Sequence, residues 1–225
     1  MPHGVIVKGI GGFYYVRTED GIAECRARGR FRRENTTPLV GDEVDITGDG
    51  GLITDIGRRR NQLARPPVAN VDQVIIVFAP SMPEINMDLL ERMVLQAEHN
   101  RLRPVICINK MDLRDGIDID GMLLPYRRAG YSVIYTSMND DRCMSSLRDV
   151  LEGSISVFSG SSGVGKSTLL NRLNPSFNLK TGDISSKAER GRNTTRQVEL
   201  LQLDNGAYVV DTPGFSSLDL DFIDK

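Results

Sequence analysis

The chain has 225 residues, of which 40% are hydrophobic and 26% are charged, and its formal net charge is −2. This composition is that of an ordinary globular protein with one large or two small domains, and no apolar run approaches the ~20 residues of a membrane span. Three widely separated cysteines indicate neither a disulfide framework nor a zinc site, and the start, MPHGVIVKGI, lacks the pattern of a secretory signal. We therefore expect a cytoplasmic protein that does not enter the membrane.

Residues 1–56 contain short β segments separated by glycine-rich or polar turns, without helical periodicity of useful length. The segments are GVIVK, GFYYVRT, GIAECRARGR, DEVDITG and GLITDIG. This pattern predicts an all-β, Greek-key barrel of the OB type over residues 1–65, with an SH3-like barrel as the alternative. Residues 58–67 (RRRNQLARPP) are expected to form a basic linker that ends in proline.

From residue 71 onwards, patterns of buried strands and amphipathic helices alternate. The sequence predicts strands at 73–79, 104–109, 132–136 and 155–159 and helices at 86–102, 118–129 and 144–152. Such alternation is typical of βαβ units with right-handed crossovers. Two further strands joined by an Asn-Gly turn, 197–203 and 207–211, are expected to form an antiparallel hairpin. We therefore expect an α/β domain over residues 66–225, with a mostly parallel sheet and one antiparallel edge hairpin.

The tetrapeptide Asn109-Lys110-Met111-Asp112 follows the second of these buried strands. In GTPases, Asn-Lys-x-Asp reads the guanine base, and ligand-binding loops of open α/β sheets follow the strands in this way. The Asp112 carboxylate would accept hydrogen bonds from the guanine N1 and 2-amino groups, which adenine does not offer, so specificity for ATP is disfavoured. Asn109 would brace the loop or read the base, and the Lys110 stem would lie along the ring. Two residues at the end of the next strand fit the loop that contacts the base oxygen: Thr136 and Ser137.

Residues 160–168 (GSSGVGKST) match the phosphate-loop pattern G-x-x-x-x-G-K-[ST] in full, between an expected strand and an expected helix. Backbone amides would curl around the phosphates, Lys166 would reach the β/γ oxygens, and the Ser167 hydroxyl would bind Mg²⁺. The alternative is a Gly/Ser-rich turn between strand and helix. The nucleotide-binding residues expected here are Gly160, Ser161, Ser162, Gly163, Val164, Gly165, Lys166, Ser167 and Thr168.

The tetrapeptide DTPG (211–214) closes an apolar strand, as expected of a switch in which Asp211 contacts Mg²⁺ and the Gly214 amide contacts the γ-phosphate. In the preceding polar loop, Thr195 is the expected second Mg²⁺ ligand, with Thr194 close behind it; an ordinary polar loop is the alternative. The metal ligands expected are Ser167, Thr195 and Asp211. The residues expected to act in catalysis are Lys166, Thr195, Asp211 and Gly214.

These motifs form the order base motif, phosphate loop, switch I and switch II, which is a circular permutation of a G domain. Joining natural termini that lie close together and cutting elsewhere preserves the sheet. Phe215 stands where Ras-like enzymes place the glutamine that orients the attacking water. Because a phenyl ring cannot do this, we expect slow intrinsic hydrolysis, with the missing group supplied by a partner or by rearrangement of switch I.

Arginines alternate in the segment CRARGRFRR, so a strand would place them on one face. OB barrels bind nucleic acid on comparable strands, and basic grooves follow phosphates. A solvated strand face is the alternative. The residues expected to contact RNA are Arg26, Arg28, Arg30 and Arg32, extended by Arg58, Arg59 and Arg60.

Taken together, the chain resembles the RsgA family (YjeQ/YloQ) of circularly permuted bacterial GTPases. The likeness includes the N-terminal barrel, the connector RPPVANVDQ, and then NKMD, GSSGVGKS, GRxTTR and DTPGF in that order. It implies a monomeric GTPase that uses GTP/GDP and Mg²⁺ and assists late maturation of the small (30S) ribosomal subunit, with that subunit and its rRNA as partners. The alternative is an RNA-binding assembly factor that uses GTP as a structural ligand with little turnover.

Two departures from the family pattern are visible. Asn193 stands where the family usually has a histidine, which puts any role of that histidine in hydrolysis in doubt. The family also continues into a C-terminal zinc-binding domain, whereas this sequence stops at Lys225. The resemblance therefore implies a truncated form or a fragment, in which zinc has no residues to bind.

Overall fold

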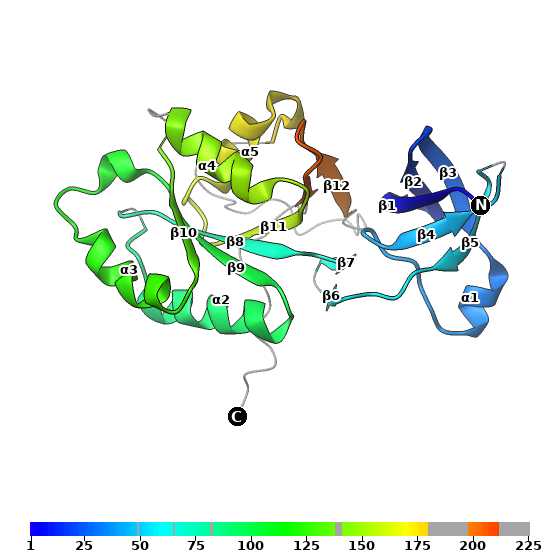
Figure 1. Cartoon of the computed structure of the whole chain (residues 1–225), viewed down its shortest axis with the longest axis horizontal. Coiled ribbons are helices and arrows are strands. Elements are labelled where there is room, and N and C mark those ends of the chain that lie inside the picture. The colour runs from blue at the N-terminus through cyan, green and yellow to red at the C-terminus, as the bar shows by residue number, and fades with distance from the viewer. Residues whose placement is uncertain (49, 65, 82, 138–140, 180–197, 212–225) are drawn as a thin grey trace, which may run out of the picture. The chain divides into compact units, whose positions relative to one another are not determined.

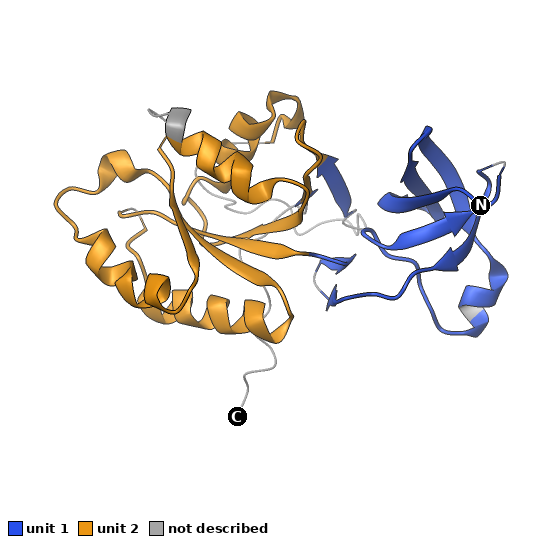
Figure 2. Ribbon diagram, viewed as in Figure 1, with its two compact units in different colours: residues 1–71, 194–201, 210–213 blue, residues 72–193, 202–209, 214–225 orange. Residues whose placement is uncertain are grey.

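A computed structural model describes residues 1–225 except 49, 65, 82, 138–140, 180–197 and 212–225. The chain divides into two compact units, which Figure 2 shows in different colours. Unit 1 comprises residues 1–71, 194–201 and 210–213, and unit 2 comprises residues 72–193, 202–209 and 214–225. The domain boundary expected between residues 65 and 66 stays a prediction.

Unit 1 is built around five strands (Figure 1): β1 (His3–Ile10), β2 (Phe13–Thr18), β3 (Gly21–Ala27), β4 (Glu43–Ile46) and β5 (Leu52–Ile56). They pair in the order β1-β2-β3-β5-β4, and β4 pairs with β1 again, which closes the barrel. Every pairing is antiparallel except that of β3 with β5. This Greek-key order confirms the predicted OB type over the SH3-like alternative.

The barrel interior is filled by alternate residues of its strands, as the two-residue period of a strand requires. Ile6, Val16, Val44, Ile46 and Ile53 are each 2% exposed or less. Burying such side chains contributes about 1.5–3 kcal/mol each to stability. The barrel is therefore held together by a compact apolar core and not by its surface charges.

One of the predicted strands ends earlier than expected. The strand predicted over residues 21–30 stops at Ala27, and Gly29–Arg33 form the short helix α1. Phe31 on this helix is only 4% exposed, and the Arg30 guanidinium bonds to the Thr54 carbonyl. The burial of the Phe31 ring gives a physical reason for the turn of helix, which is too short to be stable by itself.

The segment expected as a linker also contains regular structure. Strands β6 (Gln62–Ala64) and β7 (Pro67–Ala69) form an antiparallel hairpin in which Leu63 lies opposite Val68. Both of these side chains are nearly inaccessible to water, with exposures of 3% and 0%. The expected basic linker therefore includes a short ladder that the sequence did not predict, because its stability comes from a buried apolar pair.

Unit 2 contains a parallel sheet covered by helices on both faces. Its strands are β8 (Gln73–Phe78), β9 (Arg103–Ile108), β10 (Ser132–Tyr135) and β11 (Ile155–Ser159). Its helices are α2 (Met87–His99), α3 (Ile119–Arg128), α4 (Asp141–Leu151) and α5 (Lys166–Leu173), with short 3₁₀ turns η1 (Met111–Leu113) and η2 (Pro175–Phe177). Figure 1 shows α2 and α3 on one face of the sheet and α4 and α5 on the other.

The strand order is β10-β9-β8-β11-β13-β12, with parallel pairing from β10 through to β13; most of β12 and the end of β13 are counted with unit 1. Strands β12 (Glu199–Gln202) and β13 (Tyr208–Asp211) are neighbours joined by a short turn, so they run in opposite directions. The Leu203 amide donates to the Ala207 carbonyl across this turn, and Gly206 has the positive φ of +75° that an Asn-Gly turn requires. The predicted parallel strands are confirmed, but the hairpin does not lie at an edge of the sheet, because β12 also pairs with β1.

Strand β8 is covered on both of its faces. All six of its residues are buried, as expected of a parallel strand with helices on both sides. Helix α2 begins at a cap in which the Asn86 side chain accepts a hydrogen bond from the Leu89 amide at 3.0 Å. Because parallel strands share one carboxyl edge, the loops that follow β9, β10 and β11 meet there.

Candidate nucleotide-binding site

The loop of residues 160–165 connects β11 to α5 at the carboxyl edge of the sheet. Gly160, Gly163 and Gly165 have φ values of +140°, +84° and +95°, which residues with a side chain rarely adopt. A Cβ atom on Gly160 would overlap the Val77 carbonyl oxygen. The three glycines therefore allow a tight loop whose amides and helix N-terminus suit an anion.

Lys166 is the first residue of α5, and its side chain folds back over the loop. Its Nζ donates to the carbonyls of Gly160 at 2.6 Å and Ser161 at 2.9 Å. Burial disfavours the charged form and lowers the pKa of Lys166 to about 8. The ammonium group is thus held by backbone oxygens that phosphate oxygens could replace.

Two residues of the predicted base motif contact the phosphate loop directly. Asn109 is 1% exposed, its Nδ2 donates to the Val164 carbonyl at 2.9 Å, and its Oδ1 accepts from Thr136 Oγ1 at 3.0 Å. The Lys110 ammonium donates to the Gly163 carbonyl at 2.7 Å. Of the two roles expected for Asn109, its contacts match bracing of the loop. Residues more than fifty positions apart in the sequence therefore form one connected group.

The remaining part of the base motif is fixed by the loop that follows β10. The Met111 amide donates to the Thr136 carbonyl at 3.2 Å, and the Ser137 hydroxyl donates to Asp112 Oδ1 at 2.6 Å. Asp112 is exposed, whereas Thr136 and Ser137 are buried. The structure thus holds an open carboxylate in one orientation at the edge of the site, which suits recognition of a base.

The structure describes some of the other expected site residues only in part and others not at all. Ser167 and Thr168 lie in the first turn of α5, and Asp211 is the last residue of β13, with only its backbone described. Three further predicted residues lie outside the described residues: Thr194, Thr195 and Gly214. The structure brings together the base motif, the loop after β10 and the phosphate loop, and the roles of these residues stay predictions.

The four alternating arginines do not lie on one strand face, so that part of the prediction was wrong, whereas their contact with RNA stays a prediction. Arg26 is on β3, Arg28 precedes α1, and Arg30 and Arg32 belong to that helix. The Arg26 guanidinium lies 4.4 Å from the centre of the Phe13 ring, and Arg30 forms an ion pair with Asp55. The helical turn breaks the two-residue period on which the prediction depended.

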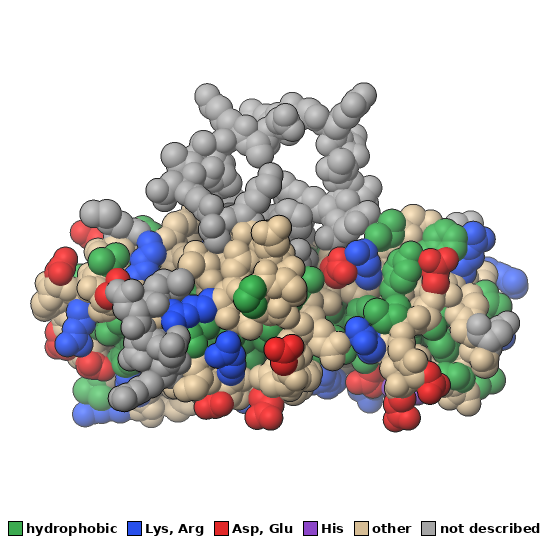
Figure 3. All heavy atoms as spheres, turned by 90° about the horizontal axis from the view of Figure 1, so that it is seen from above, with side chains coloured by type: hydrophobic (Ala, Val, Ile, Leu, Met, Phe, Trp, Pro, Cys, Tyr) green, Lys and Arg blue, Asp and Glu red, His purple; other side chains and the backbone are tan. Residues whose placement is uncertain are grey.

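Two of the three arginines at positions 58–60 have contacts within unit 1. Arg59 Nε lies 2.7 Å from Asp42 Oδ1, and its Nη2 lies 2.8 Å from Asp42 Oδ2; Asp42 is 0% exposed. Arg60 Nη2 donates to the Asn70 carbonyl at 3.1 Å, while Arg58 is exposed. On the face shown in Figure 3, basic and acidic side chains of the described residues are interspersed.

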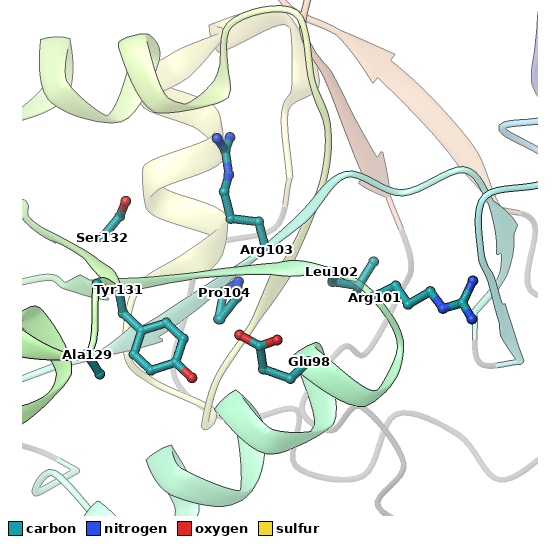
Figure 4. Close-up of a pocket in the computed structure, with 9 residues that line it drawn as sticks. Glu98, Arg101, Leu102, Arg103, Pro104, Ala129, Tyr131 and Ser132 are labelled. Atoms are coloured by element: carbon teal, nitrogen blue, oxygen red, sulfur yellow. The ribbon is translucent and has the colours of Figure 1, made fainter.

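A hollow of about 480 Å³ opens at the opposite edge of the unit 2 sheet (Figure 4). Arg103 and Ser132, which begin β9 and β10, contribute to its lining, and Figure 4 shows Tyr131 and Glu98 pointing toward one another there. The Arg103 guanidinium donates to Gln73 Oε1 at 2.6 Å and 3.1 Å. No predicted nucleotide residue lines this hollow, so it is separate from the candidate site.

The sequence analysis did not predict one contact to the base loop. Arg172, in the last turn of α5, donates from Nη1 to the Ser137 carbonyl at 3.1 Å. No motif includes this residue. A basic residue near the end of a helix favours the helix dipole, so the sequence alone gave no reason to connect it with the base loop.

The permuted sheet, the phosphate loop and the base motif braced against it define a G-domain protein of the circularly permuted class. Family models agree: the description "RsgA GTPase" matches residues 56–221 and "RsgA N-terminal domain" matches residues 3–51. The chain belongs to the RsgA family.

Individual relatives show how far the similarity extends. A protein of Caldanaerobacter subterraneus subsp. tengcongensis named small ribosomal subunit biogenesis GTPase RsgA is 53% identical, over 97% of this chain and 75% of its own length. A Bacillus cereus protein of the same name is 49% identical over 100% of this chain and 78% of its own length. Among solved structures, YjeQ from Thermotoga maritima matches 97% of this chain and 76% of its own, with a TM-score of 0.81 and 37% identity. YloQ, described as a circularly permuted GTPase, matches 100% of this chain and 75% of its own, with a TM-score of 0.80 and 39% identity.

Proposed function

We propose that this chain binds guanine nucleotides, hydrolyses GTP to GDP and phosphate, and acts in the biogenesis of the small ribosomal subunit. The observation that carries the nucleotide part is the pair of bonds from Asn109 and Lys110 to the phosphate-loop carbonyls of Val164 and Gly163. These bonds connect a base-reading motif to a phosphate-binding loop, as one bound nucleotide requires. The biological part is supported by relatives that carry the name small ribosomal subunit biogenesis GTPase RsgA.

Each predicted site residue has a defined task in this proposal. The amides of residues 160–165 and the N-terminus of α5 hold the phosphates, and Lys166 exchanges its carbonyl partners for the β/γ oxygens. Asp112, oriented by Ser137, accepts the N1 and 2-amino protons of guanine. The donor set of the chain fits Mg²⁺, with Ser167, Thr195 and Asp211 as its ligands, and the ion would neutralise charge on the phosphate oxygens.

Hydrolysis by the isolated chain is slow in this proposal. The position after Gly214 carries Phe215, which cannot orient water as a glutamine does, and Asn193 stands where the family usually has a histidine. The small ribosomal subunit supplies the missing stimulation, either directly or through a rearrangement of switch I. The Gly214 amide contacts the γ-phosphate in this proposal, and Thr194 is the alternative to Thr195 as a ligand of Mg²⁺.

The barrel of unit 1 is the proposed contact with rRNA. Arg26, Arg28 and Arg58 are exposed cationic side chains of this unit, and Arg26 stacks on the Phe13 ring in a way that also suits a nucleic-acid base. The protein acts as a monomer in the cytoplasm. Within the described part of the chain, no helix has both the length and the apolar character needed to span a bilayer.

A substitution at Asp112 that replaces an acceptor oxygen by a donor NH₂ group tests the nucleotide assignment. We expect the unaltered chain to bind GDP in preference to ADP, and Asp112→Asn to lose about tenfold or more in affinity for GDP, because bonds to a charged group contribute about 1.5–3 kcal/mol. The same variant gains affinity for xanthosine diphosphate, whose C2 oxygen accepts a bond from the new amide. Asp115→Asn, an identical change at an exposed residue of the following loop, changes neither affinity. Tight binding of ADP without binding of GDP would overturn the proposal.

A further inference from the structure

Arg172 lies six residues after Lys166 on the helix that begins at the phosphate loop. Its Nη1 donates to the Ser137 carbonyl at 3.1 Å. This interaction is partly buried, and Ser137 itself is 7% exposed. The helix dipole explains a cation near this helix end, but it does not explain a bond directed at the base loop.

Ser137 in turn determines the orientation of the base-reading carboxylate. Its hydroxyl donates to Asp112 Oδ1 at 2.6 Å, the ordinary length of a hydrogen bond from a hydroxyl to a carboxylate. The neighbouring residue Thr136 holds the same motif at two points, through the Met111 amide and the Asn109 side chain. A shift of the backbone at Ser137 would therefore move the Asp112 carboxylate.

We propose that Arg172 is a positioning residue for guanine recognition. It fixes the backbone of Ser137 against α5, and the Ser137 hydroxyl then fixes the Asp112 carboxylate at a set distance from the phosphate loop. The inference rests on the proposed function, in which Asp112 reads guanine. Arg172 itself touches neither base nor phosphate in this account.

The consequence is selectivity for the 2-amino group. Guanine presents two parallel donors, N1 and the 2-amino group, and a carboxylate accepts both only in one orientation. Hypoxanthine lacks the 2-amino group and offers the N1 donor alone, which tolerates a rotated carboxylate. Loss of the Arg172 contact should therefore weaken the binding of GDP more than the binding of inosine diphosphate.

The variants separate this role from a merely structural one. Arg172→Met removes the donors but keeps an apolar stem and a good helix former. Arg172→Lys keeps the charge and one donor in place of the planar fork. Arg128→Met is the matched control, because Arg128 is an exposed arginine in the last turn of α3. Ser137→Ala removes the hydroxyl through which Arg172 is proposed to act.

The experiment measures the dissociation constants of GDP and inosine diphosphate for the full chain and each variant. We expect Arg172→Met to weaken the binding of GDP by about fivefold to tenfold and the binding of inosine diphosphate by about twofold or less. The dissociation constants of Arg172→Lys should lie between those of this variant and those of the unaltered chain. Arg128→Met leaves both constants unchanged. In the Ser137→Ala background, Arg172→Met has a smaller effect on the preference, since the two residues act through the same carboxylate.

Two kinds of failure are distinguishable. If the unaltered chain does not prefer GDP to ADP, the proposed function fails and the role of Arg172 fails with it. If the unaltered chain prefers GDP to inosine diphosphate and Arg172→Met keeps that preference, or weakens both ligands equally, only the role of Arg172 is overturned. Thermal unfolding checks the fold of each variant. If Arg172→Met does not fold, the preference measured for Arg172→Lys decides, and an undiminished preference overturns the inference.

Discussion

Lys166 is a charged side chain whose partners in the structure are backbone carbonyls, and burial favours loss of its proton. Asn109, in contrast, is an uncharged residue that satisfies its amide through two neutral partners while almost fully buried. The first arrangement is ready to exchange partners and the second is fixed. At the scale of the residue, the site therefore combines Lys166, which can exchange its partners for a ligand, with Asn109, which holds the two loops together.

The lowered pKa of Lys166 predicts how nucleotide affinity depends on pH. The pKa is about 8 in place of 10.5, so without ligand the ammonium loses its proton as pH rises through 8. Phosphate oxygens favour the charged form, so binding takes up a proton above pH 8, and affinity falls by up to about tenfold per pH unit. Titrating GDP between pH 7 and 9.5 checks this.

The control for this titration is Lys166→Arg, because a guanidinium stays charged throughout the range. Whatever its absolute affinity, this variant should lose only the affinity that ionisation of guanine N1 removes at the alkaline end of the range. An unaltered chain whose GDP affinity stays constant from pH 7 to 9.5 would contradict a direct role of the Lys166 charge in binding.

At the scale of the element, the phosphate loop depends on the absence of a side chain where it meets the base motif. A Cβ on Gly165 would overlap Asn109 Nδ2, and Gly165 also has a φ of +95°. Gly116→Ala supplies the matched change, because Gly116 has a φ of +80° with no neighbouring atom within 4 Å. Both changes strain the backbone by about 1 kcal/mol or more.

We expect Gly165→Ala, but not Gly116→Ala, to weaken GDP binding by about tenfold or more. The added methyl group displaces the Asn109 amide from the Val164 carbonyl and disturbs the loop, whereas the control only loses stability. Calorimetry of GDP binding together with thermal unfolding separates the two effects. Equal GDP affinities in the two variants would show that the bond from Asn109 is not needed for the site.

The connection that follows the barrel depends on a buried ion pair. Asp42 is 0% exposed and also accepts a bond from the Leu39 amide, and Arg59 contacts both of its carboxylate oxygens. Arg59→Met leaves that charge without its cation and should destabilise the protein by about 3–5 kcal/mol. Arg58→Met, at the exposed neighbour, should change stability by about 0.5 kcal/mol or less. Denaturant unfolding measures both, and equal values would contradict this role for Arg59.

Much of the fold follows from local sequence, while the corrected parts depend on distant contacts. The unbroken apolar run of β8 and the strand–loop–helix around residues 160–165 were predictable because each signal lies within a few consecutive residues. Helix α1 and the β6–β7 hairpin were not, since their stability comes from buried side chains such as Phe31 and Leu63. A local pattern of alternating arginines was therefore misread as a strand face.

The candidate site shows the same division. The residue types at 109–112 and 160–168 identified the motifs, and the spacing of the strands predicted that the motifs would meet. The bonds of Asn109 to Val164 and of Arg172 to Ser137 were not predictable, because they join residues that are 55 and 35 positions apart. The lowered pKa of Lys166 likewise depends on burial, which exists only in the folded chain.

At the scale of the whole molecule, the account assigns nucleotide binding to unit 2 and rRNA contact to the barrel of unit 1. In such a protein, GTP turnover should respond to the particle on which it acts, because the chain lacks a glutamine after Gly214. The relatives carry a name that joins GTPase activity to the small ribosomal subunit. The two properties are therefore best tested together.

The most direct test is the rate of GTP hydrolysis by the chain alone, with purified small ribosomal subunits, and with large subunits as the matched control. We expect slow turnover by the chain alone, about tenfold or greater stimulation by the small subunit, as a missing transition-state contact is restored, and none by the large subunit. A rate that is the same under all three conditions would contradict the proposal that this chain is a GTPase of small-subunit biogenesis.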